Sequence, residues 1–251
     1  MTSATTVSKR SDPKLKRRVG RPSQLSLGQI LSAASKIGLP NLTLQAVADV
    51  LDVTPPALYN HIEGREDLIS KFVANVMDQF PVPAYQGEGW SNWAANYAAS
   101  LLAMYEAVPG LADYTIRRTS TGTKVLARHE MSIMAAKESG FHELEALYAT
   151  RAIIEFVAGW VARKERRDAL ERELKVHPDE EFRNYVIQKG KDEYPHLKGA
   201  LKAATSLSLS HRFEFTLRAL ISGLEVSISD TPPQKDRKKP FVTNDMTGIN
   251  V

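Results

Sequence analysis

The chain has 251 residues, of which 43% are hydrophobic, and a net charge of +4, which is enough apolar material for two packed domains. It contains no cysteine, which excludes disulfide bonds, thiolate zinc sites and cysteine nucleophiles. No apolar run is long enough to cross a bilayer, and the N-terminus lacks the hydrophobic core of a signal peptide. We therefore expect a cytoplasmic protein without a membrane partner.

Positive charge is concentrated at the N-terminus. Residues 1–24 hold seven basic residues and one acidic residue, a net charge of +6, so the rest of the chain sums to −2. We expect this segment to be a disordered basic arm that follows DNA phosphates or enters a minor groove, with Arg17, Arg18 and Arg21 suited to the narrow groove. A solvated tail that only aids solubility is the alternative.

Two short amphipathic helices are predicted after the arm. Ser26 and Gln29 have the spacing of a capping box, apolar residues then recur at helical spacing as far as Ile37, and Gly38 is a stop signal. Thr43 is placed to cap the next helix, whose apolar residues over 44–51 form one buried stripe. Both helices are expected to contribute to a small closed core.

A third predicted helix follows a tight turn at residues 52 and 53. Thr54 can cap this helix through its hydroxyl. Pro55 and Pro56 suit its first positions, because no N–H is needed there and the φ angle of proline is already helical. We therefore expect a helix-turn-helix whose second helix begins abruptly.

The side chains of this third helix divide into two sets. Leu58 and Ile62, one turn apart, are predicted to face inward. Tyr59, Asn60 and His61 then point outward with donors and acceptors suited to phosphates and base edges. Together with the basic arm, this pattern favours DNA binding over an ordinary helical hairpin.

The remainder of the chain is predicted to be helical. Apolar residues recur at helical spacing from about Ser91 onward, with breaks at 81–89, 109–110, 140, 177–178 and 194–195. The fold class is therefore all-α, with a disordered arm at 1–24, a three-helix DNA-binding head at 25–72 and a larger helical domain at 73–230. The polar, Lys-rich residues 231–251 are expected to form a disordered tail.

Catalytic and metal-binding patterns are missing from the sequence. The six histidines are scattered, and no two have the i, i+4 spacing that would place both on one metal ion. No phosphate-binding glycine loop, nucleophile elbow or paired-carboxylate motif is present. We therefore expect no enzyme activity, no metal and no cofactor.

Residues 26–72 resemble the DNA-binding domain of the TetR family of transcriptional regulators. The resemblance rests on the helix ending in Gly38, the Leu-Thr that opens the next helix, the Pro-Ala-Leu-Tyr-Asn-His run, and the Arg-Glu-Asp-Leu that opens a fourth helix. It implies phosphate contacts from Thr43, Tyr59, His61 and Arg65, and base contacts from Gln45, Pro55, Pro56, Ala57 and Asn60. Asp52 stands where the family usually has glycine, but aspartate tolerates a left-handed backbone, so the turn is expected to survive.

Aromatic residues of the second domain are candidates for an apolar pocket. Trp90, Trp93 and Tyr97 share helical spacing, and further aromatics follow them. Core packing is the open alternative, because it is the usual fate of an aromatic stripe on a helix. The candidate pocket residues are Trp93, Tyr97, Tyr105, Tyr114, Thr115, Phe156 and Trp160.

Residues 85–229 resemble, more weakly, the ligand-binding domain of tetracycline repressors. The shared features include the Gly-Trp-Ser-Asn-Trp run, the Val-Pro-Gly turn and the stretch from Phe213 to Leu224. Where those repressors use polar groups and a histidine for tetracycline and its magnesium, this chain has Tyr97 and Thr115. The resemblance therefore implies a small-molecule effector, and these differences favour one more apolar than magnesium-bound tetracycline.

Two segments, 143–167 and 211–229, are predicted to mediate self-association. The second carries an apolar stripe wider than one neighbouring helix needs, although a helix pair within one chain would show the same pattern. Relatives dimerise through equivalent helices, and a two-fold dimer reads a palindrome with half-sites about 34 Å apart, or a multiple of that. The charged segment between them, 169–206, is expected to be either a flap beside the pocket or a solvated spacer.

The sequence thus predicts a homodimeric, ligand-released repressor that binds a palindromic operator in double-stranded DNA. An architectural DNA-binding protein without an effector and an enzyme acting on a small apolar molecule are the alternatives. The sequence leaves the effector, the operator and the sign of regulation open.

Overall fold

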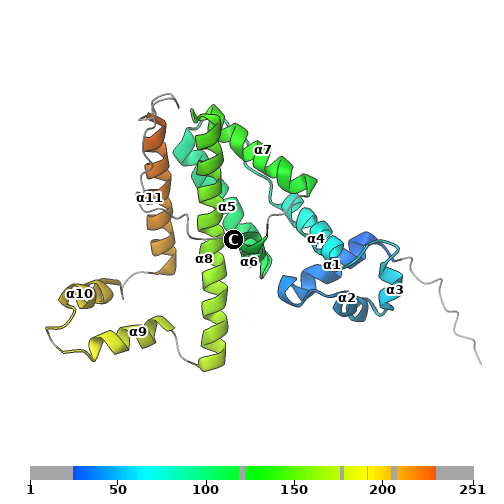
Figure 1. Ribbon diagram of the computed structural model, residues 1–251, viewed down its shortest axis with the longest axis horizontal. Helices are drawn as coiled ribbons and strands as arrows, with labels where there is room; N and C mark the ends of the chain where they lie inside the picture. The colour runs from blue at the N-terminus through cyan, green and yellow to red at the C-terminus, as the bar shows by residue number, and fades with distance from the viewer. Residues whose placement is uncertain (1–24, 119–121, 176–177, 191, 205–207, 230–251) are drawn as a thin grey trace, which may run out of the picture.

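The computed structural model describes residues 25–118, 122–175, 178–190, 192–204 and 208–229, and these residues form helices connected by turns and loops, without strands (Figure 1). The arm residues Arg17, Arg18 and Arg21 and the tail at 231–251 lie outside the described residues. The all-α prediction is confirmed. The helices are α1 (Leu27–Ile37), η1 (Leu39–Asn41), α2 (Leu44–Leu51), α3 (Pro55–Leu58), α4 (Arg65–Gln79), α5 (Trp90–Ala107), α6 (Leu111–Arg117), α7 (Thr123–Glu138), α8 (Glu143–Leu174), α9 (Pro178–Ile187), α10 (Pro195–Ala204) and α11 (Leu209–Ser229).

Local capping signals fix the first two helices of the head as predicted. The Ser26 amide donates to Gln29 Oε1 at 2.9 Å, and the Gln29 amide donates to Ser26 Oγ at 3.3 Å, which is a reciprocal capping box. The Thr43 hydroxyl accepts the Ala46 amide at 3.0 Å and caps α2. Asp52 ends α2 in the left-handed conformation with φ 53°, as the glycine-like position requires.

The third helix differs from the prediction in its cap and its length. Thr54 makes no side-chain cap, because Pro56 has no N–H and the Ala57 amide is already donated to the Thr54 carbonyl at 2.9 Å. Regular helix ends at Leu58, and the chain continues as turns in which the Ile62 amide donates to the Leu58 carbonyl at 3.1 Å. Leu58 and Ile62 are nonetheless both buried, as predicted.

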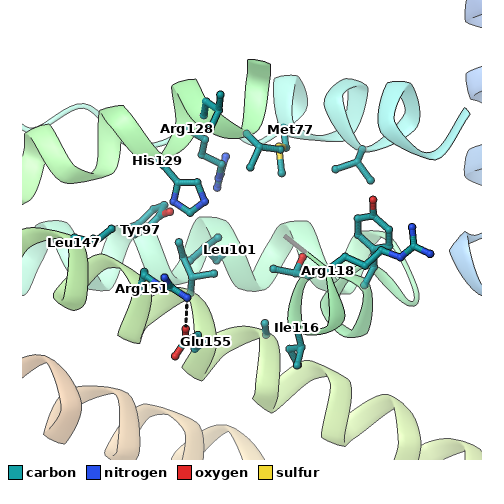
Figure 2. A pocket seen from close by; sticks show the side chains of 17 residues that line it. Met77, Tyr97, Leu101, Ile116, Arg118, Arg128, His129, Leu147, Arg151 and Glu155 are labelled. Carbon is teal, nitrogen blue, oxygen red and sulfur yellow. Dashed lines mark hydrogen bonds and ion pairs between the residues drawn. The ribbon is translucent and has the colours of Figure 1, made fainter. Parts of the chain in front are cut away.

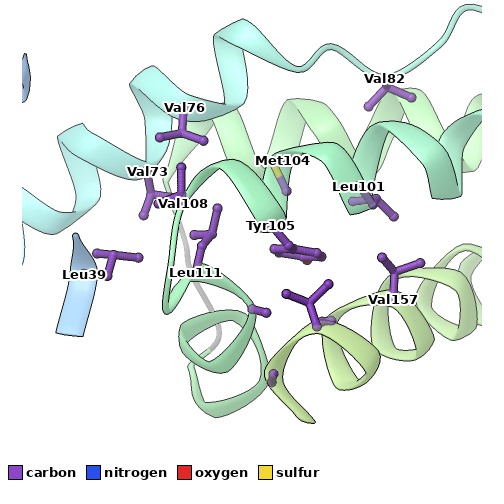
Figure 3. Close-up of a cluster of buried hydrophobic side chains, with 14 of the residues drawn as sticks. Leu39, Val73, Val76, Val82, Leu101, Met104, Tyr105, Val108, Leu111 and Val157 are labelled. Carbon is purple, nitrogen blue, oxygen red and sulfur yellow. The ribbon is translucent and has the colours of Figure 1, made fainter. Parts of the chain in front are cut away.

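Head and body share one continuous hydrophobic core. Leu39 of η1 lies in the same buried cluster as Val73 of α4, Leu111 of α6 and Val157 of α8 (Figure 3). In the body, α5, α6, α7 and α11 all pack against the long helix α8 (Figure 1). The expected domain boundary at residues 72 and 73 falls inside α4, so this helix belongs to both parts.

The segment at 169–206 begins as the last turns of α8 and continues as α9 and α10. These two short helices pack against one another, and α9 contacts α8 near its C-terminal end (Figure 1). Within the described chain, no helix combines the length and the apolar character needed to cross a membrane.

The two threonines at the starts of α2 and α3 give a matched test of the capping assignment. Thr43→Ala should lower the free energy of unfolding by about 1 kcal/mol, because the Ala46 amide loses its acceptor. Thr54→Ala should change it by less than about 0.5 kcal/mol, because that hydroxyl caps nothing. Urea titrations of both variants measure the difference, and equal losses would contradict the assignment.

Candidate functional site

The exposed surface of α3 and the turn after it gathers most of the residues expected to contact DNA. Pro56, Tyr59 and Asn60 are exposed, with Tyr59 at 57%, while Pro55, Ala57 and His61 are half-buried. Full burial of Leu58 and Ile62 beneath them holds this segment against the head. The structure therefore brings six of the nine expected contact residues together on one short segment.

The other three expected contact residues come from the starts of α2 and α4, and each already has a local partner. Thr43 caps α2, and the Gln45 side-chain amide donates to Asp49 Oδ1 at 2.7 Å. Arg65 Nε donates to the Leu42 carbonyl at 3.0 Å, which ties the first residue of α4 to the start of α2. Part of each side chain is thus committed to building the surface.

A lysine and a carboxylate that the sequence analysis did not single out fix the turn after α3. Lys71 Nζ donates to the His61 carbonyl at 3.0 Å and to Asp67 Oδ2 at 2.7 Å, and the Glu63 amide donates to the same carboxylate at 2.8 Å. Burial opposes ionisation of Asp67, but the bonds from Lys71 and Glu63 outweigh it and lower the pKa of this carboxyl. The i, i+4 spacing of Asp67 and Lys71 was the available signal.

A cavity of about 390 Å³ lies in the body between α4, α5, α6, α7 and α8 (Figure 2). Three of the seven candidate pocket residues line it: Tyr97, Tyr114 and Thr115. The full lining is Val73, Met77, Tyr97, Leu101, Tyr114, Thr115, Ile116, Arg118, Val125, Leu126, Arg128, His129, Leu147, Arg151, Ile154, Glu155 and Ala158.

The other four candidate residues lie outside this cavity. Trp93 and Tyr105 are fully buried core residues. Phe156 and Trp160 pack against Phe213 of α11, with ring centroids 5.5 and 5.3 Å from the Phe213 ring. Because residues two positions apart on a helix point in nearly opposite directions, the α8 face that presents Ile154 to the cavity turns Phe156 away from it.

The cavity lining carries more charge than the sequence analysis expected. Three arginines line the cavity, Arg118, Arg128 and Arg151, whereas Glu155 is the one carboxylate among its described lining residues; Glu155 Oε1 is 3.5 Å from Arg151 Nη2 (Figure 2). Burial and the two nearby arginines lower the pKa of His129, which therefore stays neutral at neutral pH. Among the described residues, no group of three or more His, Asp or Glu side chains is placed to hold a metal ion.

Helix α6 connects this cavity with the head. Its residues Tyr114, Thr115 and Ile116 line the cavity, and Arg118, just beyond its end, forms an ion pair with Glu66 in the first turn of α4. At its start, Gly110 packs against Pro40 of the head, and the Gly110 amide donates to Glu165 Oε1 at 3.1 Å. A shift of α6 would therefore change its contacts with both α4 and η1.

Comparison with known proteins gives matches in sequence and in structure. Residues 82–228 match the family described as tetracyclin repressor-like, C-terminal domain. The tetracycline repressor protein class D of Escherichia coli is 25% identical over 203 residues, 79% of this chain and 87% of the repressor. An HTH-type transcriptional regulator of Saccharopolyspora erythraea is 26% identical over 142 residues, 55% of this chain and 60% of that regulator.

A solved structure shares the fold over most of the chain. ActR of Streptomyces coelicolor in complex with actinorhodin superposes with a TM-score of 0.70 at 23% identity, covering 82% of this chain and 99% of ActR. The match therefore covers the large majority of the described helices.

Gly110 tests how tightly the head is held against α6. A Cβ at this position would lie 2.7 Å from Pro40 Cδ, and its φ of +84° is unfavourable for other residues. Gly110→Ala should lower the free energy of unfolding by at least about 1 kcal/mol. Gly28→Ala in α1, where a Cβ meets nothing closer than 3.9 Å, is the control and should not destabilise. Thermal unfolding compares the stabilities of the two variants. A Gly110→Ala variant as stable as the wild-type protein would contradict the close approach of Pro40 to Gly110.

Proposed function

Because this chain belongs to the TetR family of transcriptional regulators, we propose that it is a homodimeric repressor that binds a palindromic operator and leaves it when an effector fills the cavity. The observation that carries the proposal is the position of α6. This helix lines the cavity with Tyr114, Thr115 and Ile116, and the Arg118–Glu66 ion pair joins its end to α4. A ligand that moves α6 therefore acts directly on the helix that enters the head.

DNA recognition is proposed for the surface of α3 and its neighbours. In this proposal Gln45, Pro55, Pro56, Ala57 and Asn60 approach base edges. Thr43, Tyr59, His61 and Arg65 hold phosphates and so set the register of the head on the duplex. The arm arginines, which lie outside the described residues, would add minor-groove contacts and steep salt dependence.

Dimerisation is proposed through α8 and α11. Phe213 and Ile221 of the predicted stripe are buried within the chain, so the intramolecular helix pair accounts for them. Phe215 and Val226 of α11 and Tyr148 of α8 remain 60–69% exposed, and exposed large apolar side chains of this kind suit a second copy. A two-fold dimer would present two α3 segments to two half-sites of a palindrome.

The proposed switch is a change of population between two conformers of the dimer. An effector can shift that equilibrium only by its differential affinity for the two conformers, typically a coupling of about 1–3 kcal/mol. Such a coupling corresponds to about 5–150-fold in operator affinity. ActR, whose fold this chain shares, has been crystallised with actinorhodin, which supports a small molecule in the cavity here as well.

Specific DNA binding is tested by selection from a random duplex pool at near-physiological salt. We expect an enriched inverted repeat, and Asn60→Ala should weaken binding to it by about 5–150-fold, the value of one good base contact. Asn75→Ala, an exposed asparagine further along α4, is the matched control and should bind normally. Affinities come from fluorescence anisotropy.

Two other outcomes of this selection would contradict the proposal in different ways. Retention of DNA without an enriched motif would indicate an architectural DNA-binding protein. If no DNA is retained, DNA binding is excluded as the function, and the cavity becomes the primary functional site.

The route through α6 is tested with two acidic residues that pair with consecutive arginines. Glu66→Gln breaks the pair between Arg118 and α4, whereas Asp113→Asn breaks the Arg117 pair within α6, where Nε and Oδ2 are 2.6 Å apart. With a compound that releases the wild-type protein from its operator, Glu66→Gln should reduce the ratio of operator Kd with and without compound by about 2–5-fold, because an exposed ion pair contributes at most about 1 kcal/mol. Asp113→Asn should leave the ratio unchanged. Equal ratios in all three proteins would exclude this ion pair as part of the route.

A further inference from the structure

Resting on the proposed function, we propose that the effector is an organic acid with an apolar body, and that Arg128 of α7 binds its anionic oxygens. The inference starts from an unusual feature of the cavity wall. Arg128 is only 9% exposed, yet its Nε and Nη2 atoms are buried without a hydrogen-bond partner. Buried cationic donors of this kind are costly unless an acceptor meets them.

The geometry of the Arg128 guanidinium selects the kind of acceptor. Nη1 donates to the Phe80 carbonyl at the C-terminal end of α4, so that part of the group is already satisfied. The remaining Nε–H and one Nη2–H lie parallel along one edge of the planar group. That edge is the fork that carboxylates and similar planar anions occupy with two parallel hydrogen bonds.

Tyr97 of α5 adds a third donor beside this fork. Its ring centroid is 5.7 Å from Arg128 Cζ, and its hydroxyl is buried without a hydrogen bond of normal geometry. Burial raises the pKa of the Tyr97 hydroxyl above its ordinary value, although Arg128 and Ser132 act in the opposite direction, so the group stays protonated and able to donate. Figure 2 shows Arg128 and His129 projecting from α7 on the side of the cavity that faces Tyr97 and Leu101 of α5.

The charges around the cavity favour an anion over a cation. Glu155, the only carboxylate among the lining residues that the structure describes, is 3.5 Å from Arg151, and Arg118 pairs with Glu66. Neither carboxylate has a hydrogen bond or ion pair to Arg128 among the described contacts. An anionic ligand therefore meets an unpaired positive charge, whereas a cation would have to displace an existing pair.

The rest of the lining fits the body of such an acid. Val73, Met77, Leu101, Ile154 and Ala158 are apolar, and about 390 Å³ is within the range of sites for small organic ligands. The earlier expectation of a more apolar effector thus describes the body of the ligand. Arg128, Tyr97 and the neutral His129 would contact the acid group of the ligand.

The test is calorimetric titration of the full chain with anthraquinone-2-carboxylate, 2-naphthoate and 9-anthracenecarboxylate, each beside its own carboxamide. We expect at least one acid to bind about tenfold or more tighter than its carboxamide. Arg128→Gln should abolish that preference by weakening the acid at least tenfold while leaving carboxamide affinity within threefold. Arg151→Gln, an arginine of the same cavity with a carboxylate partner, should keep the preference.

A purely structural role for Arg128 predicts a different pattern. If it serves only to hold Phe80, Arg128→Gln should weaken acid and carboxamide alike. Tyr97→Phe gives a second variant should Arg128→Gln fail to fold, and it should weaken the acid about 3–10-fold and the carboxamide by less, because a hydrogen bond to a charged acceptor is the stronger one. Acids that bind no better than their carboxamides, or a preference that survives both variants, would overturn the inference.

These titrations, combined with operator binding and release measured with the same compounds, separate this inference from the proposed function. If only neutral compounds release the protein from its operator, the proposed repressor function stands and the organic-acid effector is wrong. If acids bind through Arg128 but the protein selects no specific DNA sequence, the acid-binding site stands and the repressor function is wrong.

Discussion

Pro40 of the head packs against Gly110 of the body so closely that no side chain fits between them, and a Cβ at Gly110 would stand 2.7 Å from the proline ring. Leu39 beside it is buried in the same cluster as Leu111 and Val157. Close-packed interiors resist continuous deformation and shift between discrete arrangements instead. The head therefore cannot turn on the body without repacking this contact, and in the proposed switch that constraint would convert a local change at α6 into a change of head position.

The energetic weight of this connection lies in packing more than in charge. The Arg118–Glu66 pair that joins α6 to α4 is more than half exposed on both sides, and such pairs contribute at most about 1 kcal/mol. Each large apolar side chain buried at the junction contributes about 1.5–3 kcal/mol relative to an exposed one. In the proposed switch the ion pair would therefore bias the equilibrium between the two conformers, while the shared core would determine which conformers are possible.

Local features of this fold could be predicted from sequence, because their causes are local. The capping box at Ser26, the Thr43 cap and the left-handed Asp52 each depend on residues within one turn. Thr54 shows the limit of that reasoning: the residue type suits a cap, but Pro56 has no amide hydrogen and the Ala57 amide is donated to the Thr54 carbonyl instead. Which residues line the cavity could not be predicted from local sequence. Arg118, Arg128 and Arg151 come from three separate segments, and the packing of the helices brings them to one cavity.

The buried guanidinium of Arg128 connects stability with function. Buried guanidinium atoms without an acceptor, here Nε and Nη2, carry a desolvation cost in the protein without a ligand. In the proposed complex an acceptor in the fork would remove this cost, so part of the binding free energy would come from satisfying these donors. Arg128 also donates to the carbonyl of Phe80, the residue that caps α4. A ligand that reorients its guanidinium would therefore act on the C-terminal end of α4, while α6 would act on its first turn. Two contacts at opposite ends of one helix would let the proposed effector change the tilt of α4, which neither contact could do alone.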